Sequence, residues 1–308
     1  MSDDDQPTAA PDHEADGTVS WRALMAEAAE QLADAGIAQA STEARWIVEE
    51  ASGMDGTELV LGLDRPATVR GVAHLDHMMG RRLAGEPIQY VLGHWPFRQL
   101  DLLVDRRVLI PRPETEQVAE HALRALDAVA LGRPAGHRLT VVDLGTGTGA
   151  IALAIASERV ATEVWATDRS PDAIAVARAN VAGLGRAGAR VRIVEGSWFD
   201  PLPTELRGSI DLLVSNPPYI ASHEELDPSV ADWEPTDALV PGETGLEAYE
   251  VIIGGAGDWL APDGVLVLEI GATQAEAVCR IAVDAGLTEV TVHQDHAGLD
   301  RTVVATRA

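Results

Sequence analysis

The sequence has 308 residues, a formal net charge of −26 and 46% hydrophobic residues, but only 4% aromatic residues. This length allows one large domain or two smaller ones, with a core built mainly from Ala, Val, Leu and Ile. All 23 basic residues are arginines, and none lies in a cluster longer than a pair, so no direct contact with nucleic acid is expected. The single cysteine, Cys279, excludes an internal disulfide.

Residues 1–18 are acidic and rich in Asp, Pro and Ala, and we expect them to form a disordered acidic tail. The N-terminus has no basic region followed by an apolar run, so no signal peptide is predicted. No apolar stretch reaches the roughly 20 residues that cross a bilayer. These features predict a cytoplasmic protein without membrane contacts.

Residues 19–86 show helical periodicity, with Leu24 and Leu32 on one face of the first helix, and predict a small helical bundle. The pattern then changes to short alternating runs interrupted by Pro96. Residues 87–110 are therefore predicted to be a β-hairpin linker between two domains.

Residues 111–308 alternate between strand and helix patterns, which predicts an α/β domain whose mostly parallel sheet has helices on both faces. The connection 294–301 is too short for a helical crossover, so the last two strands are expected to pair antiparallel. The predicted helices are 114–131, 150–157, 171–183, 248–259 and 274–285; the predicted strands are 139–144, 163–168, 190–194, 210–215, 264–270, 289–293 and 302–306.

A glycine turn follows the first of these strands, in the stretch VVDLGTGTGAIALAIA. Glycines at this point let the backbone turn tightly and approach a ligand closely. No Lys follows, so the turn is not a Walker-type phosphate loop, and its spacing differs from G-x-G-x-x-G. The alternative is a tight turn that binds nothing. The candidate cofactor-binding residues are Gly145, Thr146, Gly147, Thr148 and Gly149.

Two further candidate cofactor-binding residues stand at the carboxyl ends of the next two strands, at the same edge of the predicted sheet. Asp168 ends the second strand, where a carboxylate is placed to accept hydrogen bonds from ribose hydroxyls. Trp198 follows the third strand and is placed to pack on an adenine ring. The alternatives are a helix cap for Asp168 and an ordinary loop aromatic for Trp198.

The fourth strand ends in Asn216-Pro217-Pro218-Tyr219. A planar NH₂ group is a poor nucleophile because its lone pair is delocalised. The Asn216 side-chain oxygen and the Pro217 carbonyl can accept its two hydrogens, Pro218 fixes the turn, and Tyr219 can stack on the flat group. We therefore assign Asn216, Pro217 and Tyr219 as catalytic residues, and all four as substrate-binding residues. The alternative is a proline-rich strand terminator.

Together these strand ends predict a pocket for an activated nucleoside beside a planar amine, which fits S-adenosyl-L-methionine as methyl donor and S-adenosyl-L-homocysteine as product. Asp168 would meet the ribose, Trp198 the adenine, and the glycine turn the amino-acid portion, with Asn216 also against the donor. Alignment for in-line displacement supplies much of the rate.

The combination of motifs closely resembles the peptide chain release factor N5-glutamine methyltransferases. The resemblance spans about residues 87–275. The segments that carry it are IPRPETE, VVDLGTGTGAIALAIA, ATDRSPDAIAVARAN, DLLVSNPPYI, WEPTDAL, GLEAY and LVLEIGATQ.

The resemblance implies a seven-stranded, Rossmann-like class I methyltransferase sheet with an antiparallel last strand, after a small N-terminal helical bundle. It implies that residues 19–86 recognise the substrate and that residues 111–308 form the methyltransferase domain. The implied substrate is the glutamine of the Gly-Gly-Gln motif in peptide chain release factors, whose methylation tunes translation termination. We expect a monomer.

Two other classes of function remain open at this stage. A DNA or RNA amino-methyltransferase uses a similar Asn-Pro-Pro-Tyr motif, but it needs a basic face that the net charge of −26 does not favour. A cofactor-binding scaffold without catalysis is the second. His74 and His77 lie at i, i+3 without a third ligand nearby, so no metal site is predicted.

Overall fold

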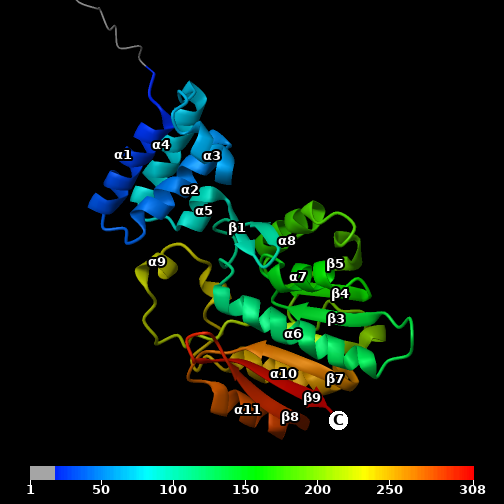
Figure 1. Ribbon diagram of the computed structural model, residues 1–308. Coiled ribbons are helices and arrows are strands. Elements are labelled where there is room, and N and C mark those ends of the chain that lie inside the picture. The colour runs from blue at the N-terminus through cyan, green and yellow to red at the C-terminus, as the bar shows by residue number, and fades with distance from the viewer. Residues whose placement is uncertain (1–17) are drawn as a thin grey trace, which may run out of the picture. The chain divides into compact units, whose positions relative to one another are not determined.

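The computed structural model describes residues 18–308, which form two compact units divided between Leu92 and Gly93 (Figure 1). Except for Thr18, the predicted acidic tail lies outside the described residues.

The first unit is a helical bundle, as predicted. Ser20 caps α1 by accepting a hydrogen bond from the backbone of Ala23, and Thr68 caps α4 through Gly71. The apolar faces of these helices share one core. Its helices are α1 (Trp21–Asp34), α2 (Ala40–Ser52), α3 (Gly56–Gly62), α4 (Val69–Leu83) and α5 (Ile88–Leu92).

The hairpin prediction is wrong at its first residues, because Ile88–Leu92 is the helix α5. Pro87 stands just before this helix, where its missing N–H costs nothing, and Ile88 and Val91 pack into the core of the helical bundle. The hairpin itself is shorter and comprises β1 (His94–Phe97) and β2 (Leu100–Leu103).

The second unit contains a seven-stranded sheet with the order β5-β4-β3-β6-β7-β9-β8. Only β9 runs against the others, and it pairs antiparallel with both β7 and β8. The predicted class I methyltransferase sheet and its antiparallel last strand are confirmed. The strands are β3 (Leu139–Leu144), β4 (Thr162–Asp168), β5 (Val191–Glu195), β6 (Ile210–Ser215), β7 (Leu260–Glu269), β8 (Leu287–Gln294) and β9 (Asp300–Arg307).

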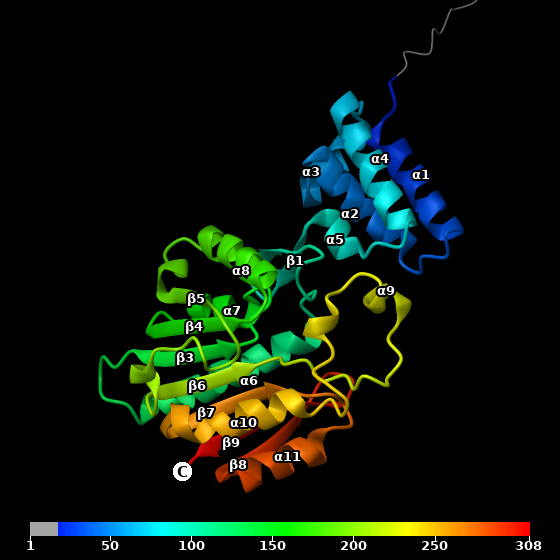
Figure 2. The same cartoon turned by 180° about the vertical axis from the view of Figure 1, so that it is seen from behind.

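Helices cover both faces of this sheet. Helices α6 and α7 pack on one face, in front of the sheet in Figure 1, against residues such as Val141 and Val214. Helices α10 and α11 cover the other, seen in Figure 2, against Val142 and Leu213. The helices are α6 (Pro113–Leu131), α7 (Ala150–Glu158), α8 (Pro171–Gly183), α9 (Pro228–Ala231), α10 (Glu247–Trp259) and α11 (Ala275–Asp284).

The strand order places a topological switch between β3 and β6. The chain moves outward from β3 to β4 and β5, then returns to β6 on the other side of β3. Loops that leave the carboxyl ends of β3 and β6 therefore part in opposite directions, and ligands bind in the crevice between such loops.

The side chain of Asn180 on α8 ties the hairpin to the glycine turn. Its Oδ1 accepts from the Leu103 backbone N–H at 2.8 Å, and its Nδ2 donates to the carbonyls of Leu103 and Thr148 at 3.2 and 2.9 Å. One buried amide thus satisfies three backbone groups from two distant segments.

We expect Asn180→Ala to lower the free energy of unfolding by about 1–3 kcal/mol, because it leaves the buried Thr148 carbonyl and the Leu103 backbone groups without this partner. Urea denaturation of the purified protein measures this loss. Arg178→Ala, at an exposed position of the same helix, is the matched control. Equal stability of the two variants would contradict the role given to Asn180.

Candidate functional site

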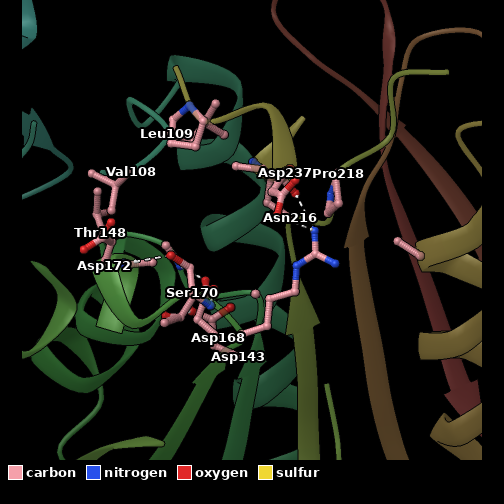
Figure 3. A pocket seen from close by; sticks show the side chains of 18 of the residues that line it. Val108, Leu109, Asp143, Thr148, Asp168, Ser170, Asp172, Asn216, Pro218 and Asp237 are labelled. Atoms are coloured by element: carbon pink, nitrogen blue, oxygen red, sulfur yellow. Dashed lines mark hydrogen bonds and ion pairs between the residues drawn. The ribbon is translucent and has the colours of Figure 1, made fainter. Parts of the chain in front are cut away.

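A cavity of about 600 Å³ opens at the carboxyl ends of β3, β4 and β6. Figure 3 shows Asp143, Asp168 and Ser170 together on one side of it, with Asn216 and Pro218 on another. Of the predicted site residues, those that line it are Gly145, Thr146, Gly147, Thr148, Asp168, Trp198, Asn216 and Pro218. The sheet thus brings residues at the ends of four strands, β3, β4, β5 and β6, to one hollow, as the sequence predicted.

The glycine turn folds back on the end of β4. The N–H groups of Gly145 and Thr146 both donate to the Thr167 carbonyl at 2.9 Å. Gly147, whose φ is +55°, donates its N–H to Asp168 Oδ2 at 2.9 Å. Gly149 is not among the residues that line the cavity and is instead the N-cap of α7.

The Asp168 carboxylate is held by backbone donors on both sides. Oδ2 accepts from Gly147, and Oδ1 accepts from the Ser170 N–H at 2.9 Å. Burial raises the pKa of this carboxyl, while the two backbone hydrogen bonds oppose the shift. The bonds fix the carboxylate at the cavity wall, and each oxygen keeps a lone pair for a hydroxyl of a ligand.

Trp198 lies over the glycine turn with a left-handed backbone, at φ +46°. Its carbonyl accepts from the Thr167 hydroxyl at 2.9 Å, which fixes the loop after β5 to the end of β4. A Cβ atom on Gly145 would come within 3.4 Å of the Trp198 ring. The indole and the glycine backbone therefore form one continuous wall.

Asp143 is a cavity residue that the sequence analysis did not select. Its Oδ2 accepts from the Thr146 hydroxyl at 2.6 Å and from the Ala152 N–H at 3.2 Å. Its Oδ1 is buried and has no hydrogen-bond partner among the described residues. Burial raises the pKa of Asp143 to about 7. The available clue was an acidic residue within an otherwise apolar strand.

A smaller cavity of about 190 Å³ lies against Asn216, Pro217, Pro218 and Tyr219. Asn216 and Pro218 line this cavity and the larger one as well. Asn216 and Pro218 thus lie between two adjacent cavities, and Pro217 and Tyr219 line the smaller one. Burial raises the pKa of Tyr219 to about 12, further above physiological pH than that of an exposed tyrosine.

Gln274 fixes the backbone beyond the motif. Its Nε2 donates to the carbonyls of Tyr219 and Gly245 at 2.9 and 3.3 Å, and its Oε1 accepts from the Gly271 N–H at 3.0 Å. The Tyr249 hydroxyl donates to the Glu269 carbonyl at 3.1 Å beside it. The segments GLEAY and LVLEIGATQ therefore support the Asn-Pro-Pro-Tyr turn.

Asn216 is held by a buried chain of hydrogen bonds. Its Nδ2 donates to Thr115 Oγ1 at 3.2 Å, and the Thr115 hydroxyl donates to Glu269 Oε2 at 2.7 Å. Burial raises the pKa of Glu269 to about 7; the Thr115 hydrogen bond opposes the shift. Neither Thr115 nor Glu269 was selected from the sequence, although both lie in segments that carry the resemblance.

Two ion pairs hold the loops around the cavities. Arg112 pairs at 2.5 Å with the buried carboxylate of Glu234, which also accepts from the Ile110 N–H. Arg169 pairs with Asp237 at 3.2 Å across the larger cavity, and both side chains are exposed. Figure 3 shows the contact at Asp237.

Within residues 18–308, no helix has the length and apolar character that a membrane span requires. No group of three or more His, Cys, Asp or Glu side chains in that range could hold a metal ion.

We expect Gly245→Ala to disturb the motif, because an added Cβ would lie 2.5 Å from the Tyr219 carbonyl and the residue has φ +76°. A strained φ and a backbone clash together cost about 1–3 kcal/mol. Thermal unfolding should show the loss, with Gly257→Ala, which has open space around it, as the control. An unchanged melting temperature in Gly245→Ala would contradict the close approach.

Comparison with known proteins gives matches over most of the chain. Residues 23–93 match the family model described as PrmC N-terminal domain, and residues 126–232 match the one described as Methyltransferase small domain. Three curated relatives carry the name "Release factor glutamine methyltransferase". The relative from Geobacter sulfurreducens is 39% identical over 88% of this chain and 91% of its own length. That from Cereibacter sphaeroides is 42% identical over 89% and 94%, and that from Agrobacterium fabrum 35% over 95% and 98%.

Proposed function

Since the chain belongs to the release factor glutamine methyltransferase family, we propose that it methylates a glutamine side chain of peptide chain release factors. The methyl donor is S-adenosyl-L-methionine, and the acceptor is the amide nitrogen N5 of the glutamine in the Gly-Gly-Gln motif. One observation carries the proposal: Asn216 and Pro218 form a wall common to a cavity of about 600 Å³ and one of about 190 Å³. A donor in the first and a glutamine side chain in the second would meet at the motif.

The residues of the larger cavity fit this donor. The unpartnered Oδ1 of Asp143 suits an ammonium group, which supplies the hydrogen-bond donor and positive charge that a buried carboxylate lacks. Asp168 would hold the ribose hydroxyls through its remaining lone pairs. Trp198 would pack against the adenine, and the turn at Gly145–Gly149 would hold the amino-acid portion.

The motif residues act on the acceptor. When bound, the donor supplies a methyl carbon on a positively charged sulfur, which makes it electrophilic. Asn216 Oδ1 and the Pro217 carbonyl accept the two hydrogens of the glutamine amide, which orients its nitrogen and concentrates electron density on it. Tyr219 presents its neutral ring to the flat amide. Pro218 donates no backbone hydrogen that would compete for these oxygens.

The helical unit is proposed to recognise the release factor, with the methyltransferase domain following it. The match of residues 23–93 to a family-specific N-terminal model supports this division. Mass spectrometry of a release factor co-expressed with the enzyme tests the proposed function, and one added methyl group on the Gly-Gly-Gln glutamine is the expected result. Incorporation of labelled methyl into DNA, with none in the release factor, would overturn it.

Asn216→Ala should lower kcat for methylation by at least ~10²-fold, because a preorganised polar contact in a reaction site is often worth that much. Steady-state assays with purified release factor measure the effect. Gln294→Ala, which removes an exposed amide at the end of β8, is the control and should keep wild-type activity. Wild-type kcat in Asn216→Ala would refute the hydrogen-bonding role.

Asp143→Asn should stabilise the protein at pH 8 and weaken its binding of S-adenosyl-L-homocysteine. The pKa of Asp143 in the fold, about 7, lies above its ordinary value. Its contribution to stability is therefore fully present at low pH and is lost as the pH rises through about 7. The neutral amide avoids this loss, so the gain should be on the order of 1 kcal/mol or more at pH 8 and vanish by pH 4.

Thermal unfolding at the two pH values measures the stability, and calorimetric titration measures the binding. The same affinity in Asp143→Asn and the wild type would contradict the assignment of Asp143 to the ammonium group.

A further inference from the structure

The hydrogen-bond chain that ends at Asn216 has a defined direction. It joins three segments: the loop after β6, the first turn of α6, and the end of β7. Thr115 and Glu269 are both buried, at 3% and 1% exposure, so water does not substitute freely for either partner. Each polar group of this hydrogen-bond chain must therefore find its hydrogen-bond partner in the neighbouring group.

The direction starts at Glu269. An ionised carboxylate only accepts hydrogen bonds, so the single hydrogen of the Thr115 hydroxyl points to Glu269 Oε2, 2.7 Å away. The hydroxyl oxygen can then only accept from Asn216. The group of Asn216 that meets it, at 3.2 Å, must be the NH₂. The chain thus fixes which end of a nearly symmetric carboxamide faces α6.

The other end of the carboxamide is the one that matters for the acceptor. Its carbonyl oxygen lies at the opposite corner of the planar group, and Asn216 lines both cavities. In the reversed orientation, an NH₂ group would face the incoming glutamine NH₂. Two donors would then meet without an acceptor, and the nitrogen would lose one of the two contacts that orient it.

We propose that Thr115 and Glu269 are positioning residues that hold the Asn216 carboxamide with its oxygen towards the substrate amide. The inference rests on the proposed function, since it needs a planar amide as acceptor. Thr115 also lines the larger cavity and Glu269 the smaller one, and the role given to both is to orient Asn216.

The surroundings of Glu269 agree with a carboxylate whose ionisation matters. Arg301 and Arg112 favour its charged form, whereas burial and Glu114 oppose it. The phenolic groups of Tyr219 and Tyr249 lie close enough for its charge to raise their pKa values. Burial outweighs these charges and raises the pKa of Glu269 to about 7, so Glu269 is mostly ionised at pH 8, where the hydrogen-bond chain has the direction given above.

The test compares Thr115→Val, which keeps the shape of the side chain but removes the hydroxyl, with Thr115→Ser, which keeps the hydroxyl. We expect Thr115→Val to lower kcat on the order of ten-fold, the worth of about one hydrogen bond, with little change in KM for the release factor or in affinity for S-adenosyl-L-homocysteine. Thr115→Ser should restore most of the loss. Glu269→Gln should also lower kcat, because an amide no longer dictates the direction of the chain.

A double-mutant cycle separates positioning from a general structural effect. In the Asn216→Ala background, Thr115→Val and Glu269→Gln should have no further effect on kcat, because the group that they orient is gone. Multiplicative losses in that background would overturn the inference, as would wild-type kcat in both single variants. If Thr115→Val does not fold, the cycle with Glu269→Gln tests the same orientation of Asn216. A wild-type enzyme that fails to methylate the release factor would instead refute the proposed function.

Discussion

The parallel pairing of β3 with β6 is the constraint on which the site depends. Their register sets Val141 opposite Leu212 and Asp143 opposite Val214. Both strands consist mainly of apolar residues and are buried on both faces, which is typical of strands in parallel sheets. Because the two strands end at the same level, the glycine turn and the Asn-Pro-Pro-Tyr turn leave the sheet side by side. The two cavities exist at this edge for that reason.

The buried acids of the second unit fall into two groups with different electrostatics. Asp211 and Glu234 each form an ion pair with an arginine, at 2.7 and 2.5 Å, and they hold loops to the sheet. Asp143 and Glu269 are hydrogen-bonded to threonine hydroxyls instead, and burial raises the pKa of each to about 7. The fold thus keeps its incompletely compensated carboxyl groups at the site, where perturbed pKa values commonly mark function.

Much of the fold followed from local patterns. Strands 139–144 and 210–215 and helix 171–183 are found at the predicted residues, since each is an apolar or periodic run with clear end signals. The hairpin begins later than predicted, because the apolar residues of Ile88–Leu92 are buried in the core of the helical unit. A local sequence pattern does not show which core an apolar residue joins. The positions of the motif residues at one edge of the sheet followed from the parallel direction of the strands, since the carboxyl ends of parallel strands share an edge.

The contacts that support the motif could not be predicted in the same way. Thr115 and Asn216 are 101 residues apart, and Thr115 and Glu269 are 154 apart. The segments that contain these residues were identified in the sequence. No rule of sequence spacing, however, predicts that the N-terminus of a helix contacts the ends of two strands. Gln274 is similar, since its role depends on carbonyl groups of Tyr219 and Gly245 that meet only in the folded chain.

The ion pair between Arg169 and Asp237 has a consequence for the kinetics of exchange. Both side chains are more than half exposed, and pairs of this kind typically contribute less than about 1 kcal/mol. Separating them requires no movement of the sheet or of the helices that cover it. Under the proposed function, breaking this pair would therefore add less than about 1 kcal/mol to the exchange of donor and product in the larger cavity. The time for which a ligand stays bound would then depend on its contacts inside the cavity. Added salt, which weakens the exposed ion pair, would shorten that time little.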